Sequence, residues 1–564
     1  MRIYFLLIVN ALILISCGKN GSQADLVLIN GLVYTANDAN PKTEAVAVKG
    51  GRIIKVGSRE EIMELSGDST MLLDLEGKVV FPGFAEGHAH IMGIGSNLIN
   101  VDLSAAKSYD EVVEMVKLRA EGTPEGKWIL GRGWHQNKWE QEPEGMFNGF
   151  PTHNLLSEAV PNHPVVLSHA SGHAVLVNAK AMQLAGINDT TQSPDGGDVF
   201  KGLDGQPTGI LNETASYLVR RIIPTEAKAA KTEKLQLAID HCLENGITSF
   251  HQAGSVSADL QLFEEFAKNQ DLKLRIHAMI AGYDSATVAE YFNKGPQSNL
   301  YNDHLNIRSI KLYSDGALGS RGAWLLEEYS DAPGVFGHNT TPMSEIKKLT
   351  NQALETGFQV CTHAIGDRAN REVLDIYEEA FSTHGDVSND LRFRIEHAQH
   401  IDPQDLPRFA KLGVLPAMQA IHMSSDRPWA IDRLGKERIE TGAYMWSDLI
   451  DSGSKIINGT DAPVEPVNPL ACFYASVSRK TLSGNPEGGY EPSQKMTRQE
   501  ALKSYTLWPA FGAFMEDQIG SIEEGKYADF TILNKDIMTI SEEEILETEV
   551  VMTIIDGQVV YVNL

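Results

Sequence analysis

Two histidines one residue apart, His88 and His90, follow the apolar run Val79–Phe81 and a Pro-Gly pair. On an extended strand, residues two apart project to the same side. The two imidazoles could therefore bind one metal ion together. Taken alone, this spacing is more typical of exposed or hydrogen-bonded histidines, so the interpretation depends on the rest of the chain.

Four further apolar runs each end in a polar side chain that could bind a metal. These side chains are Lys311, His363, His397 and Asp461. Each has an ordinary structural explanation: a hydrogen-bonded core histidine, an exposed lysine or a turn aspartate. Five ligand-bearing strand ends in one chain are far less expected by chance. The pattern predicts that the strand ends meet at one metal site.

The elements that would position these side chains alternate along the chain. Amphipathic helices are predicted over 111–120, 232–245 and 344–356, and short strands over 246–251, 274–280, 307–313, 359–363, 393–397 and 455–460. Regular alternation of this kind favours an α/β fold with a parallel sheet, most simply an eight-stranded barrel. In that barrel the active site lies at the carboxyl ends of the strands.

Both ends of the chain have a different pattern. Short β-branched runs separated by Gly-Gly or polar turns fill 25–80, and similar runs fill 516–564. We expect the two segments to pair in one sheet domain beside a barrel over 81–515. Residues 100–225, rich in Gly, Pro, Trp and Asn, break the alternation and are interpreted as an insertion that covers the barrel mouth.

The first 17 residues resemble an export signal. A basic start precedes an almost wholly apolar run, which ends in Leu14-Ile15-Ser16-Cys17. This ending is similar to a bacterial lipobox, which predicts a lipidated Cys17, a tether over 18–24 and a membrane-anchored lipoprotein of the cell envelope, on the periplasmic or outer surface side. The alternative is an ordinary cleaved signal with an incidental cysteine.

Composition excludes some classes of partner. The chain has 564 residues, with 48 Lys and Arg against 75 Asp and Glu, a formal net charge of −27. Phosphate binding requires basic surface, so no nucleic-acid partner is expected. Cys242, Cys361 and Cys472 are too few and too scattered for a disulfide framework and are expected to be buried.

Several longer motifs together resemble the amidohydrolase superfamily, and within it the YtcJ-like amidohydrolase 3 group. The motifs lie at 82–90, 133–139, 172–178, 207–213, 246–249, 311–322, 362–367, 394–398, 459–464 and 525–530, and the resemblance covers about 25–564. It implies a TIM-like (β/α)8 metal-dependent hydrolase barrel with a urease-like β-sandwich formed by the two terminal segments.

The resemblance also implies a ligand set. The first metal would be held by His88, His90 and Asp461, and the second by His363 and His397. Lys311 matches a lysine that, in related members, carries a carbamate bridging two metals. Two Zn²⁺ ions are the first expectation, with Mn²⁺, Fe²⁺ or Co²⁺ as alternatives, because the ligands are nitrogen and oxygen. A one-metal site beside an unmodified Lys311 stays open.

The implied activity is hydrolysis of a non-peptide carbon–nitrogen bond in a small amide or cyclic amide. A metal can lower the pKa of bound water to about 7, which generates hydroxide at neutral pH. Asp461 would accept its proton and pass it to the leaving nitrogen. Ester or carbamate hydrolysis is the alternative chemistry, and a catalytically silent, ligand-binding lipoprotein is the alternative class. The expected partner is a small molecule, with a homodimer possible.

Substrate contacts are expected from His173, Trp134 and Asp315, the last of which should also shape the loop after Lys311. Two positions depart from the pattern of many relatives. Ser171 stands where an aspartate is common, and His135 stands where an acidic residue is frequent. These departures leave the metal ligands in place but weaken any transfer of a relative's substrate. Glu86 is expected to support the histidines from behind.

Overall fold

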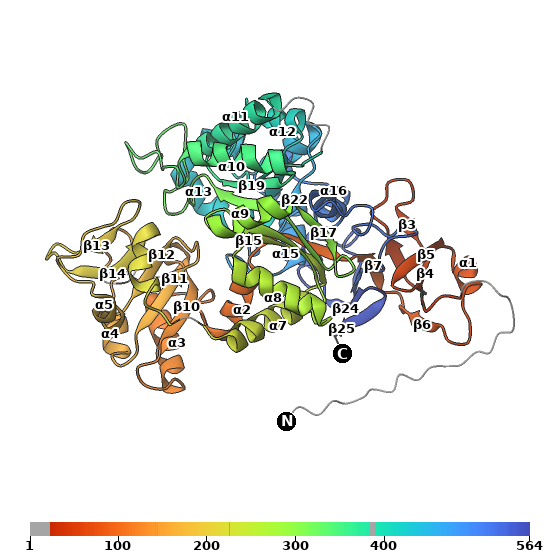
Figure 1. Ribbon diagram of the computed structural model, residues 1–564, viewed down its shortest axis with the longest axis horizontal. Coiled ribbons are helices and arrows are strands. Elements are labelled where there is room, and N and C mark those ends of the chain that lie inside the picture. Colours follow the sequence, from red (N-terminus) through yellow and green to blue (C-terminus); the bar gives the residue numbers. More distant parts are fainter. Residues whose placement is uncertain (1–22, 141–142, 144, 225, 384–389, 564) are drawn as a thin grey trace.

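Three parts lie side by side in the computed structural model, which describes residues 23–140, 143, 145–224, 226–383 and 390–563. A barrel occupies the centre, a lobe formed by the insertion lies on one side, and a pair of sheets lies on the other (Figure 1). Residues 1–17, with the predicted lipidation site Cys17, lie outside the described residues. In the described part of the chain, no helix combines the length and apolarity needed to span a bilayer.

The barrel has eight strands, and each pairs in parallel with the next. They are β8 (Phe84–Ala89), β15 (Ile247–Ser255), β16 (Arg275–Ala281), β18 (Leu305–Tyr313), β19 (Gln359–Ala364), β20 (Arg394–His397), β21 (Leu415–Met418) and β22 (Ile457–Asn458). The predicted α/β barrel is confirmed. The sequence pattern did not identify β21.

The first and last barrel strands meet through glycine. A Cβ on Gly87 would lie 2.3 Å from the carbonyl oxygen of Asn458, well inside contact distance. The Asp461 N–H donates to the His88 carbonyl over 2.8 Å just above this point. A close backbone approach therefore joins β8 to the end of β22 and brings the two ligand-bearing segments together.

Helices between the strands cover the barrel. They include α7 (Lys228–Glu244), α8 (Ser257–Lys268), α10 (Met343–Thr356) and α11 (Asp367–Thr383), each with buried apolar residues on one face. The predicted helices 232–245 and 344–356 correspond to α7 and α10. The predicted helix 111–120 corresponds to α3 (Tyr109–Glu121), which packs against strands of the insertion.

The two ends of the chain share a sheet, as predicted. β7 (Val79–Pro82) pairs antiparallel with β23 (Phe530–Leu533), and β24 (Val550–Ile555) and β25 (Gln558–Val562) extend that sheet. A second sheet, of order β5-β4-β1-β6, comes from the N-terminal segment alone: β1 (Leu26–Ile29), β4 (Ala45–Lys49), β5 (Arg52–Gly57) and β6 (Met71–Asp74). Buried residues of both sheets form one core, which completes the composite β-sandwich.

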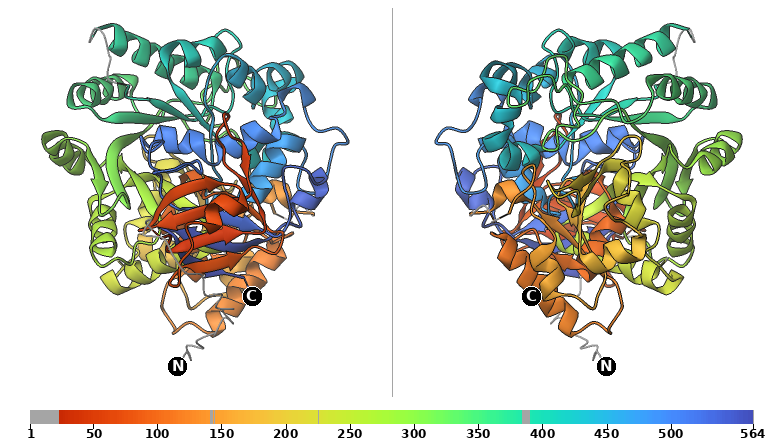
Figure 2. Two further views of the ribbon diagram at one scale, coloured as in Figure 1. Left: turned by 90° about the vertical axis from the view of Figure 1, so that its right-hand side faces the viewer. Right: turned by 90° about the vertical axis from the view of Figure 1, so that its left-hand side faces the viewer.

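The insertion forms a lobe with its own six-stranded sheet. Its strands are β9 (Val101–Asp102), β10 (Ile129–Trp134), β11 (Val165–His169), β12 (Ala174–Val177), β13 (Val199–Lys201) and β14 (Pro207–Asn212). When the molecule is viewed from the side that carries the insertion, the lobe lies in front of the barrel (Figure 2, right). Arg132, near the end of β10, reaches the barrel, where its Nε donates to the Pro463 carbonyl over 3.4 Å.

Candidate metal centre

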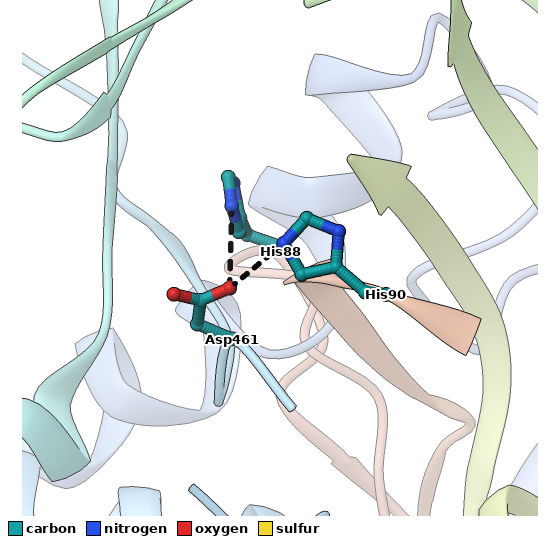
Figure 3. A group of neighbouring side chains, drawn as sticks. All are labelled: His88, His90 and Asp461. Atoms are coloured by element: carbon teal, nitrogen blue, oxygen red, sulfur yellow. Dashed lines mark ion pairs between the residues drawn. The ribbon is translucent and has the colours of Figure 1, made fainter. Parts of the chain in front are cut away.

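His88, His90 and Asp461 converge at the carboxyl end of the barrel strands. Asp461 Oδ1 lies 3.6 Å from His88 Nε2 and 3.2 Å from His90 Nε2. Figure 3 shows both rings turned toward this one carboxylate. Potential ligand atoms of the three residues all lie within 4.8 Å of one another, close enough for one ion. The structure thus brings together the histidine pair and the aspartate that follow strands at opposite ends of the barrel sequence.

The Asp461 carboxylate is held by a constrained loop. Asp461 has φ of 55°, a left-handed conformation that costs free energy for a non-glycine residue. The preceding Thr460 donates its N–H and its hydroxyl to the Glu86 carboxylate, over 2.7 and 2.8 Å. Burial raises the pKa of Glu86 to about 8, although these donors oppose the shift. Glu86 therefore supports the Asp461 loop, a more specific role than the sequence suggested.

Lys311, His363 and His397 lie beside this group. The His397 ring centroid is 4.9 Å from that of His88 and 4.5 Å from that of His363. Lys311 is buried at 1% exposure on β18 and lines the same cavity. Burial lowers the pKa of its amine to about 8.

Three polar atoms of this region are buried without a hydrogen-bond partner among the described residues. They are Lys311 Nζ, His363 Nε2 and Asp461 Oδ1. Buried polar groups in native proteins are nearly always satisfied, so unpaired nitrogen and oxygen atoms that converge from separate strands call for a missing partner. A divalent cation suits a donor set of imidazole nitrogens and carboxylate oxygens. The residues present therefore fit a metal centre.

A buried ion pair orients the His88 ring, and the sequence analysis missed it. His88 Nδ1 forms a short hydrogen bond with Glu396 Oε2. Arg394 binds the same carboxylate through Nε at 2.7 Å and a terminal nitrogen at 2.9 Å. Burial alone would raise the pKa of Glu396, but Arg394 and His88 hold it well below its usual value. A hydrogen at Nδ1 leaves Nε2 as the metal-binding nitrogen.

His397 is oriented in the same way. Its Nδ1 lies 2.8 Å from Gln419 Oε1, and Gln419 in turn donates to the Ala417 carbonyl over 3.0 Å.

The sequence carried one signal for the role of Glu396, the two-residue period of a strand: Arg394 and Glu396 lie two residues apart and share a face of β20. Gln419, just after β21, carried no comparable signal.

The residues predicted to contact substrate occupy different environments. His173 lines the cavities at the barrel mouth, and its Nδ1 lies 3.0 Å from Glu213 Oε2. Burial would lower the pKa of His173, but Glu213 raises it overall. Trp134 is 1% exposed in the core of the insertion, where its Nε1 donates to the Leu167 carbonyl over 2.9 Å. Trp134 therefore packs the core of the insertion and does not line the substrate cavity.

Asp315 is also buried, as a connector between loops. Its carboxylate accepts backbone N–H groups from Trp324, Ile365 and Gly366 over 2.8 to 3.0 Å. Burial raises the pKa of Asp315 to about 7 despite these donors. Its Oδ1 lies 3.4 Å from His363 Nε2. Asp315 thus fixes the loops after β18 and β19 around the metal centre, and neither Asp315 nor Trp134 belongs to the walls of the two cavities there.

Two adjoining cavities open onto the centre. We call the one lined by His88, His90, Arg132, Lys311 and Tyr313 the metal chamber. We call the one lined by His135, Leu318, His422, Asp426, Trp429 and Glu465 the side chamber. Both share a wall of Ser171, His173, His363, His397, Asp461 and Val464. A bond held at the shared wall would have room for its substituents in both chambers.

Comparisons with known proteins agree with this architecture. The family model described as "Amidohydrolase family" matches residues 72–561. The putative amidohydrolase YtcJ of Bacillus subtilis is 34% identical over 94% of this chain and 98% of its own. The N-substituted formamide deformylase of Arthrobacter pascens is 27% identical over 95% of this chain and 98% of its own. The crystal structure of an uncharacterised metal-dependent hydrolase from Pyrococcus horikoshii superposes with a TM-score of 0.73 at 28% identity, covering 92% of this chain and 99% of that one.

Proposed function

Given that the chain belongs to the amidohydrolase family and is a hydrolase of carbon–nitrogen bonds, we propose that it cleaves a non-peptide amide or cyclic amide of a small molecule. The observation that carries the proposal is the convergence of His88, His90 and Asp461 beside two buried nitrogens without a hydrogen-bond partner among the described residues, Lys311 Nζ and His363 Nε2. The similarity to a deformylase of N-substituted formamides makes such formamides the first substrates to test.

Each residue of the centre has a role in this proposal. When bound, a divalent metal polarises a carbonyl and lowers the pKa of water. His88, His90 and Asp461 would hold a first ion, and His363 and His397 a second. Asp461 takes up the proton of the attacking water and passes it to the leaving nitrogen. The Glu396 carboxylate keeps His88 in the tautomer that presents Nε2.

Lys311 is proposed to carry a carbamate between the two ions. The neutral Nζ forms a bond to the carbon of CO₂ while one C=O π pair of CO₂ moves onto oxygen, and the nitrogen loses one proton, so a neutral amine becomes an anionic oxygen ligand. Burial without a partner supports this assignment, and a pKa of about 8 leaves part of the amine neutral at physiological pH. An unmodified ammonium at this position would repel a divalent ion.

Metal content and formamide hydrolysis test the proposal together. We expect about two metals per chain in the wild-type protein, with turnover, and a large loss of both in Lys311→Ala. Lys347→Ala is the control, because Lys347 is exposed and pairs with Glu379 on the surface. One metal in both proteins would make Lys311 a structural residue. A wild-type protein that takes up no metal would contradict the hydrolase proposal and favour the silent ligand-binding alternative.

We also propose that the mature chain is anchored to a cell-envelope membrane through a lipid on Cys17. The proposal rests on the apolar run and the Leu-x-Ser-Cys ending. We expect Cys17→Ala to move the protein from the membrane fraction to the soluble fraction without change in its specific activity. Ser22→Ala, which leaves the apolar run and the Leu-x-Ser-Cys ending intact, is the control. Membrane association that persists in Cys17→Ala would refute the anchor.

A further inference from the structure

One face of helix α13 (Ala420–Gly442) forms a wall of the side chamber. His422, Asp426 and Trp429 all line the chamber, and residues separated by four and then three positions lie on one side of a helix. The helix starts directly after Gln419, the residue that orients His397. The His422 ring lies parallel to the His397 ring at 6.2 Å between centroids. This face is therefore placed to contact whatever part of a substrate extends from the metal centre.

The chamber contains an acidic group, Asp426, that has no ion-pair partner among the described residues. The Asp426 carboxylate accepts a hydrogen bond from Ser425 Oγ over 3.3 Å, and no described lysine or arginine forms an ion pair with it. The other acid of the wall, Glu465, has Lys138 Nζ at 3.7 Å. Burial raises the pKa of Asp426 to about 6, with Glu465 adding to the shift and His422 and Lys138 opposing it. The carboxyl is thus ionised in mildly alkaline solution.

Independent atoms in the same chamber also lack partners. His422 is 7% exposed, and its Nε2 has no hydrogen-bond partner within the described ranges. The same holds for Nε1 of Trp429. Buried polar atoms of this kind are normally satisfied by a ligand or by water. The Trp429 ring, Leu318 and Ile365 supply apolar surface around them.

We propose that the side chamber binds the non-reacting end of the substrate and that this end is an aromatic or aliphatic group bearing a protonated amine, which pairs with Asp426. This inference rests on the proposed function and adds the substrate class. A terminal carboxylate would face Asp426, which lacks the lysine that pairs with Glu465, and be repelled, so N-acyl amino acids bound in this direction are poor substrates.

Three N-formylbenzylamines that differ only in the para substituent test the charge preference. They are the N-formyl derivatives of 4-methylbenzylamine, 4-(aminomethyl)benzylamine and 4-(aminomethyl)benzoic acid, which end in a methyl, an ammonium and a carboxylate. With the metal-loaded full chain at pH 8, we expect kcat/KM to be about tenfold higher for the ammonium than for the methyl probe, and about tenfold lower for the carboxylate. A single ion pair with Asp426 accounts for the first change, and repulsion between two carboxylates accounts for the second.

Substitution of Asp426 assigns the preference to this wall. Asp426→Asn should lower kcat/KM for the ammonium probe by about tenfold or more and leave the methyl probe within about twofold. Asp432→Asn is the control, because Asp432 is exposed on the same helix. It should leave all three values unchanged. Equal kcat/KM for the three probes, or a preference for the carboxylate, would overturn the inference.

The same probes distinguish a failure of the proposed hydrolysis from a failure of the proposed charge preference. Turnover of the methyl probe supports hydrolysis whatever the charge preference, so the two ideas separate. If no formamide is cleaved, binding of 4-methylbenzylamine and of the neutral 4-methylbenzyl alcohol is measured by calorimetry. Tighter binding of the amine that is lost in Asp426→Asn would support the side-chamber assignment alone, and equal binding of the two compounds would overturn it.

Discussion

At the scale of single residues, the orientation of the His88 ring depends on the Glu396 carboxylate, which the spacing of the metal-binding residues in the sequence did not indicate. Glu396 accepts from His88 Nδ1 and is itself bound by Arg394 at 2.7 and 2.9 Å. We expect Glu396→Gln to weaken metal affinity by about 10- to 100-fold, since hydrogen-bond partners of metal-binding histidines contribute that much. Titration of the metal-loaded protein with a chelator measures the change.

The same substitution removes the negative charge that pairs with Arg394 in the barrel interior. Removal of one member of a buried ion pair destabilises a protein by about 3 to 5 kcal/mol, so a lower Tm should accompany the loss of metal. Glu372→Gln is the matched control, because Glu372 pairs with Arg368 at 3.7 Å on the surface of a helix. Unchanged chelator resistance in Glu396→Gln would show that the carboxylate does not orient His88.

The candidate ligands could be predicted from the sequence because each is a ligand-type side chain at the end of an apolar run. The partners that orient them could not, since Glu396 and Gln419 acquire their roles only through contacts across the barrel. Trp134 shows the opposite case. An aromatic residue in a Gly-rich insertion is equally compatible with a pocket wall and a core, and only the packing around it decides.

At the scale of elements, the position of the two ligand segments depends on the contact between β8 and β22. A Cβ on Gly87 would lie 2.3 Å from a backbone oxygen, which cannot move aside as a flexible side chain could. We expect Gly87→Ala to separate the strands, lower the free energy of unfolding by about 1 to 3 kcal/mol, as overpacking does, and reduce metal content. Chemical denaturation and metal analysis measure the two effects.

Gly122→Ala is the control for this experiment. Gly122 has a negative φ of −93°, and its added Cβ would have Arg119 O at 3.9 Å as its nearest neighbour. Its free energy of unfolding should stay within about 0.5 kcal/mol of the wild-type value. A Gly87→Ala protein with full stability and full metal content would show that the barrel does not need this close approach.

Element boundaries followed the sequence where the apolar run was long, as in β18 and β19. They departed from it where local chemistry interrupts the run. β21 contains Pro416, which weakens the pattern of a strand, and it was not predicted. The strand predicted over 455–460 shortens to Ile457–Asn458, because the chain turns at once into the loop that carries Asp461.

At the scale of the whole molecule, a buried ion pair joins the barrel to the sandwich. Arg275 of β16 binds Asp529 through two nitrogens at 2.7 and 3.0 Å and stacks on the Tyr527 ring at 3.9 Å. We expect Asp529→Asn to lower the free energy of unfolding by about 3 kcal/mol, since the guanidinium is 1% exposed and would lose its main counter-charge. Thermal and chemical unfolding measure this loss.

A surface ion pair provides the comparison. Asp38, with 83% side-chain exposure, pairs with Lys503 at 2.6 Å, and Asp38→Asn should cost no more than about 1 kcal/mol. Equal effects of the two substitutions would show that the junction contributes no more than a surface contact. The pairing of the terminal segments could be predicted from their matching strand patterns, whereas Arg275 and Asp529 gave no sign of each other in the sequence.

The shared sheet has a consequence for the order in which the chain can mature. β7 leads directly into the strand that carries His88, yet its partner β23 begins at Phe530 and is synthesised after the entire barrel. Until then β7 presents unpaired backbone groups along that edge, which favours recognition by chaperones and proteases. A ribosome that stops early therefore releases a product that quality control can distinguish from the finished enzyme, even when every catalytic residue has already been made.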